Sequence, residues 1–138
     1  MLAMTGKYRA KRPFFIAYLL FLLLGLLLTL GRWYGVFQED FVIWNAEVHS
    51  HLSNFSLSMI LYVGIGYSWL LYGRKFGAVV VLGVLLIAGN VVCETWMGFL
   101  NTPDIMDAVY GAVGVLAAYG YLFALNRYGL EERPPRKA

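Results

Sequence analysis

Four long uncharged stretches alternate with short charged segments along the chain. Each stretch is rich in aliphatic and aromatic residues and is long enough to cross a hydrocarbon core, which takes about 20 residues of helix. The stretches lack the two-residue alternation of a strand, and a helix satisfies every backbone amide within lipid. The pattern therefore predicts an all-α integral membrane four-helix bundle, in one domain, with spans at residues 13–31, 53–72, 76–97 and 103–126.

The segments outside these spans give two further expectations. Apolar side chains recur at helical spacing in the long first loop, at Phe37, Phe41, Trp44 and Val48. This spacing predicts a short interfacial helix that lies on the membrane surface. The segment 127–138 after the fourth span is charged and rich in proline, so we expect a flexible tail.

Composition supports a membrane protein. Of the 138 residues, 60% are hydrophobic and 14% are charged, and the mean hydropathy is +0.65. Soluble domains have roughly 45–50% apolar and about 25% charged residues, so this composition excludes both an ordinary soluble domain and a disordered chain. The single cysteine, Cys93, excludes an internal disulfide and a two-cysteine redox relay.

The basic residues predict the orientation. Of the 11 lysines and arginines, all but Arg32 lie in the two terminal segments and the second loop. By the positive-inside rule, both termini are expected in the cytoplasm of a multi-pass protein of the bacterial inner (cytoplasmic) membrane. Most acidic residues fall at the opposite, outer ends of the spans. Because the basic residues are divided among three short segments, a nucleic-acid partner is not expected.

The polar span ends suggest where a ligand binds. Ionisable groups near membrane spans are costly, by about 2.5–3.5 kcal/mol at the centre, and usually mark function. Reversal of the chain between spans brings several such groups to the outer surface, where we expect a ligand-binding polar pocket. Its candidate residues are Arg32, His49, His51, Asn54, Glu94, Asn101, Asp104 and Asp107.

Small residues predict how the fourth span packs. Gly111, Gly114 and Ala118 continue the three- and four-residue steps begun by Asp104 and Asp107. Small residues permit close helix contact, so this face is expected to point into the bundle and to direct Asp107 inward. A structural role is the alternative for several candidates: the first aspartate can cap the helix, and the histidines can be interfacial polar residues.

No cofactor or catalytic machinery is evident from the motifs. A metal needs three or four converging ligands, and no metal-binding spacing is present, so we predict no metal and no cofactor. His49 and His51 are too close in sequence to hold a haem between them. Cys93 has no basic activator nearby in sequence, and no serine nucleophile motif is found. The catalytic residues, if the protein is an enzyme, stay unassigned.

Two stretches resemble a known family. In ETWMGFLNTPDIMDAVYGAVG an acid ends one span, an aspartate pair follows a short loop, and glycines then recur; VHSHLSNFSLSMILY begins the second span with His51. In these features the chain resembles the VanZ-like family of small bacterial membrane proteins. The resemblance implies a link with glycopeptide resistance, especially to teicoplanin, and no established catalytic residue. The family commonly has an arginine shortly before the aspartate, where this chain has Asn101 to Pro103. An asparagine often precedes the glycines, where this chain has Tyr110. A separate four-span family is therefore the alternative.

Three functions are compatible with these features. The first, favoured here, is a non-enzymatic membrane protein whose outer pocket binds a cell-envelope ligand, a lipid headgroup or a partner protein. The second is an enzyme acting on a lipid-linked glycan or a lipid headgroup, with Asp107 or Glu94 as general base and His51 as acid–base partner. The third is a small assembly subunit. The expected partners are membrane lipids, an envelope glycan or glycolipid, and a second copy of the chain or a larger membrane complex.

Overall fold

The computed structural model of the chain describes residues 6–38, 40–96 and 103–134. Its principal elements are the helices α1 (Arg12–Phe37), α2 (Ala46–Leu71), α3 (Phe76–Trp96) and α4 (Ile105–Ala124). Each is long and apolar enough to cross a membrane. The predicted four-helix, apolar architecture is therefore confirmed.

The first connection differs from the prediction. α1 continues to Phe37, and α2 begins at Ala46, so the described part of segment 38–45 contains no separate interfacial helix. The apolar residues that suggested such a helix are divided between the end of α1, the loop and the start of α2. The cause lies in capping, because the Asn45 side chain accepts a hydrogen bond from the Val48 amide at 2.8 Å and starts α2 early.

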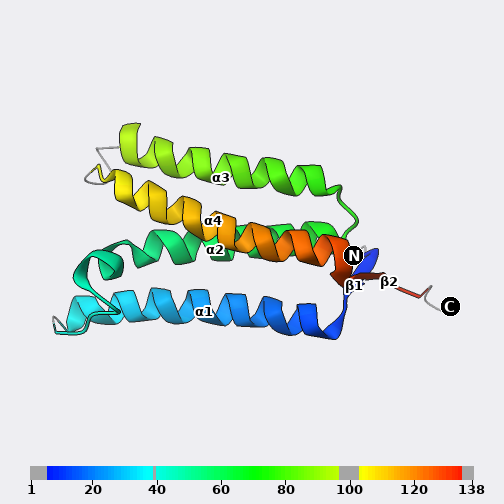
Figure 1. The fold of residues 1–138 in the computed structure, drawn as a ribbon, viewed down its shortest axis with the longest axis horizontal. Helices are drawn as coiled ribbons and strands as arrows, with labels where there is room; N and C mark the ends of the chain where they lie inside the picture. Colours follow the sequence, from blue (N-terminus) through cyan, green and yellow to red (C-terminus); the bar gives the residue numbers. More distant parts are fainter. Residues whose placement is uncertain (1–5, 39, 97–102, 135–138) are drawn as a thin grey trace, which may run out of the picture.

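The helices are arranged around a central pair, α2 and α4 (Figure 1). α1 packs on α2, and α3 packs mainly on α4. The central pair approaches closely because Gly114 lies against the backbone of Phe55, where a side chain would overlap the Phe55 carbonyl. The buried core lies along this contact and consists largely of apolar residues, including Met59, Tyr62, Val63, Leu70, Val115, Ala118 and Leu122.

The outer helices expose most of their apolar side chains. Gly25 is the buried residue of α1, whereas large side chains such as Leu20 and Leu27 are more than half exposed. In a soluble protein such a surface would be an aggregation liability, but a lipid solvent makes it favourable. The exposed faces of α1 and α3 are therefore the expected lipid-facing surfaces.

Both ends of the described chain meet in a small sheet. β1 (Tyr8–Ala10) pairs antiparallel with β2 (Leu130–Glu132), which follows a π-helical turn at Leu125–Gly129. Arg9 and Glu131 form an exposed ion pair across the sheet at 3.1 Å. Within the segment expected to form a flexible tail, residues 130–132 thus have backbone partners near the start of the chain.

Most charged residues divide by sign between the two ends of the bundle, and among the described residues the exceptions are Glu131, Glu132 and Arg32. We call the end with β1, β2 and the α2–α3 connection the basic end; it carries Lys7, Arg9, Lys11, Arg12, Arg74, Lys75, Arg127 and Arg133. The acidic end is formed by the starts of α2 and α4 and the ends of α1 and α3. It carries Asp40, Glu47, Glu94, Asp104 and Asp107.

Candidate functional site

A histidine–aspartate pair joins α2 to α4 at the acidic end. His51 Nδ1 lies 2.7 Å from Asp107 Oδ1, and the two side chains are 9% and 16% exposed. His51 lies one to two turns into α2, and Asp107 lies in the first turn of α4. The close contact at Gly114 holds the two helices near enough for this hydrogen bond. A charge-assisted bond of this kind is stronger than one between neutral groups.

Asp104 has two roles in the same place. It caps α4, because its Oδ1 accepts a hydrogen bond from the Met106 amide at 2.9 Å. Its Oδ2 also lies 3.9 Å from His51 Nδ1, and the carboxylate is 46% exposed. The capping role considered from the sequence is therefore present, and Asp104 additionally offers a carboxylate oxygen that solvent or a ligand can reach.

Glu94 contacts Asp104 through the Asp104 backbone amide. It lies near the end of α3, is buried, and accepts a hydrogen bond from the Asp104 amide through Oε2 at 3.3 Å. The contact fixes the start of α4 against the end of α3. Glu94 is therefore a positioning residue for Asp104 in this arrangement.

We call His51, Asp104 and Asp107 the His–Asp cluster. Each offers one ligand atom, and these atoms all lie within 4.8 Å of one another. One imidazole and two carboxylates form a donor set that divalent transition metals accept. All three were candidate residues of the outer pocket, but their spacing in the sequence matches no metal-binding motif because they come from two different helices. The same groups can also accept hydrogen bonds or transfer a proton.

An apolar cavity adjoins the cluster. The ring of Tyr110 lies 5.0 Å from the His51 ring, centroid to centroid, at an interplanar angle of 31°. Tyr110 also lines a cavity of about 260 Å³ between α2 and α4. The other lining residues are Val48, Leu52, Phe55, Val109 and Val113. The polar cluster and an apolar surface therefore meet at this tyrosine.

Tyr110 was not among the residues expected to bind a ligand. Its position three residues after Asp107 is the signal that could have identified it, because side chains three apart lie on neighbouring parts of a helix face. Val48 with Leu52, and Val109 with Val113, show the same kind of spacing on the two cavity walls.

The other candidates lie outside the cluster. His49 accepts a hydrogen bond from the Ile43 amide through Nδ1 at 3.2 Å and so braces the first loop. Arg32 lies near the end of α1, and its buried Nε has no hydrogen-bond partner among the described residues. Asn54 is half-buried on α2, and the hydrogen bonds that hold the cluster do not include it. Asn101 lies outside the described residues.

Two part-buried polar contacts lie below the cluster. Asn90 Nδ2 donates to Ser58 Oγ at 3.0 Å, linking α3 to α2. The hydroxyls of Thr29 and Ser56 lie 2.8 Å apart, linking α1 to α2. Interhelical hydrogen bonds of this kind help to hold spans together in lipid. α2 thus contributes polar side chains toward all three other helices.

Comparison of the chain with family models, with curated proteins and with solved structures finds no match. The function therefore has to be inferred from the site itself.

Proposed function

We propose that this chain is a VanZ-like inner-membrane protein whose His–Asp cluster faces outward and binds the headgroup of a cell-envelope lipid or lipid-linked glycan. The observation that carries this proposal is the junction at Tyr110, where the polar cluster meets an apolar cavity of about 260 Å³. A ligand with a polar head and a hydrocarbon chain matches both surfaces at once.

The chemistry of the cluster favours a headgroup rich in hydroxyl or amino groups. Carboxylates accept hydrogen bonds from such groups, and Asp104 is exposed enough to be reached from water. Asp107 is already engaged by His51, which holds its carboxylate in a fixed orientation. The VanZ-like resemblance, with its link to glycopeptide resistance, supports an envelope glycan as the headgroup.

The proposed orientation places the basic end in the cytoplasm and the acidic end outside. In a Cys93→Ser background, Asp40→Cys in the first loop is expected to react with a membrane-impermeant maleimide in intact cells. Lys75→Cys at the opposite end should react only after the membrane is permeabilised. The measurement is labelling of the purified protein on a gel. Equal labelling of both positions in intact cells, or the reverse pattern, would contradict the orientation.

Binding can be tested with a matched pair of variants. Wild-type protein incubated with an extract of bacterial envelope lipids, lipid-linked glycans included, is expected to retain one component detected by native mass spectrometry. Asp107→Asn should reduce this retention at least tenfold, because it removes the charge that orients His51. Asp40→Asn makes the same chemical change in the exposed first loop and should leave retention unchanged. Equal retention by the wild type and Asp107→Asn would refute the proposed site.

The His51–Asp107 hydrogen bond favours a second candidate, an enzyme acting on the same ligand class. A histidine oriented by a carboxylate can serve as general acid or base. Incubating the purified protein with the same extract would then convert a lipid into a new product, and His51→Gln would abolish the conversion. Retention of an unmodified lipid distinguishes the binding protein from the enzyme.

A further inference from the structure

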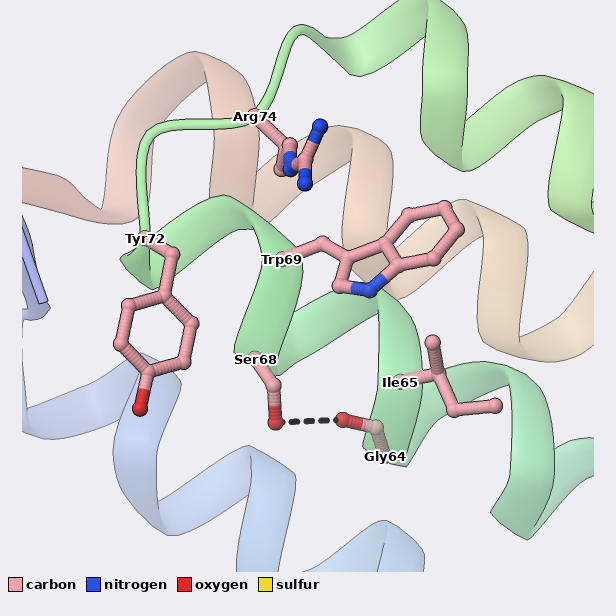
Figure 2. A pocket seen from close by; sticks show the side chains of 6 residues that line it. All are labelled: Gly64, Ile65, Ser68, Trp69, Tyr72 and Arg74. Atoms are coloured by element: carbon pink, nitrogen blue, oxygen red, sulfur yellow. Dashed lines mark hydrogen bonds between the residues drawn. The ribbon is translucent and has the colours of Figure 1, made fainter. Parts of the chain in front are cut away.

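A second pocket lies at the basic end, far along α2 from the His–Asp cluster. Figure 2 shows the side chains that line it, and its volume is about 640 Å³. It is lined by Gly64, Ile65, Ser68, Trp69, Tyr72 and Arg74. All of these residues except Arg74 belong to α2 or follow it directly. The pocket is therefore a groove along one face of α2, and the groove ends at the Arg74 guanidinium.

The mouth of this groove has the chemistry of a lipid–water interface. Arg74 is exposed, and a guanidinium can bind a phosphate through two parallel hydrogen bonds. In Figure 2 the Arg74 side chain lies on the same side of α2 as the Trp69 indole. Trp and Tyr prefer the headgroup level of a bilayer, so Trp69 and Tyr72 place the mouth at that depth.

The floor of the groove extends toward the middle of the span. Gly64 lies eight residues before Tyr72, which corresponds to about 12 Å along a helix axis. A Cβ atom added at Gly64 would meet no atom of the described residues within 4 Å, so this part of the groove is open next to the helix backbone. The Ser68 hydroxyl donates to the Gly64 carbonyl at 2.9 Å, which leaves the floor without a free donor (Figure 2).

We propose that this groove is a binding site for an anionic phospholipid. The phosphate binds Arg74, the glycerol region lies beside Trp69 and Tyr72, and one acyl chain covers Ile65 and Gly64. A phospholipid, and not free phosphate, is the occupant because the groove continues from the cation into the hydrocarbon depth of α2. Positive charge at the mouth selects anionic over zwitterionic headgroups. The site shares no residue with the His–Asp cluster and does not depend on the function proposed for it.

The test measures lipid preference in the full-length protein. Purified protein is incubated with an equimolar mixture of phosphatidylglycerol and phosphatidylcholine in detergent, and bound lipids are counted by native mass spectrometry. The wild type is expected to retain phosphatidylglycerol at least fivefold in excess, which is the preference expected from one interfacial cation. Inorganic phosphate at millimolar concentration should not displace the lipid. Absence of any preference, or displacement by phosphate, would overturn the proposal.

Two matched pairs of variants locate the site. Arg74→Gln should abolish the preference, whereas Lys75→Gln removes the same charge next to the pocket and should keep most of it. Gly64→Leu fills the floor and should reduce lipid retention at least fivefold. Gly120→Leu adds the same side chain at another open glycine, on α4, and should not. Equal losses within either pair would overturn the site, and unchanged helicity by circular dichroism shows that each variant is folded.

Discussion

The Gly114→Ala variant is expected to lose about 3 kcal/mol of unfolding free energy, a large effect for one methyl group. The added Cβ would overlap the carbonyl of Phe55, and a backbone group inside α2 cannot rotate away as a side chain can. α2 and α4 must therefore separate, which loosens the packing of the buried Val115 and Ala118. Reversible unfolding in mixed detergent micelles, followed by circular dichroism, measures the loss.

The matched control is Gly120→Ala on the same helix. A Cβ at Gly120 meets nothing within 4 Å, so this variant should stay within about 0.5 kcal/mol of the wild type or gain slightly from the better helix propensity of alanine. Equal stability of the two variants would show that α2 and α4 do not depend on the close contact at Gly114. A selective loss would show that they do.

Hydropathy predicted the four helices and most of their ends to within two residues, but it missed the end of α1 and the start of α2. A hydropathy pattern locates the apolar part of a span, whereas a helix begins and ends where capping and packing allow. α2 therefore begins at Ala46, after the Asn45 cap, and not at residue 53. The pairing of β1 with β2 could not be predicted either. Each strand has only three residues, which is too short for an alternation of polar and apolar residues to be recognised, and the strands come from opposite ends of the chain.

The residues of the candidate site were likewise predicted only in part from the sequence. The spacing of Asp104 and Asp107 predicted that they lie together, and the structure places them side by side, with Asp104 as the cap of α4 and Asp107 in its first turn. His51 was also preferred over His49 as the acid–base partner, and helix geometry gives the physical reason. His49 and His51 are two residues apart, about 200° around a helix, so they point to opposite sides. His49 therefore contacts the first loop while His51 reaches Asp107.

Breaking the His51–Asp107 contact is expected to give the second large effect. His51→Phe keeps an aromatic ring beside Tyr110 but removes the Nδ1 atom, and Asp107→Ala removes the carboxylate. Each variant should lose about 2 kcal/mol of unfolding free energy, because a hydrogen bond to a charged group contributes about 1.5–3 kcal/mol. The same detergent unfolding assay measures both.

The double variant shows whether the two losses have one origin. If His51 and Asp107 stabilise the protein through their mutual hydrogen bond, the double variant should lose much less than the sum, leaving a coupling energy of about 1–2 kcal/mol. His49→Phe is the control, since His49 contacts Ile43 and its loss should add to that of Asp107→Ala without coupling. Additive losses for His51→Phe and Asp107→Ala would mean that the two side chains do not form this hydrogen bond in the folded protein. If Asp107→Ala couples with His51→Phe but not with His49→Phe, the hydrogen bond between His51 and Asp107 is present. The ligand-binding proposal for the His–Asp cluster requires this hydrogen bond.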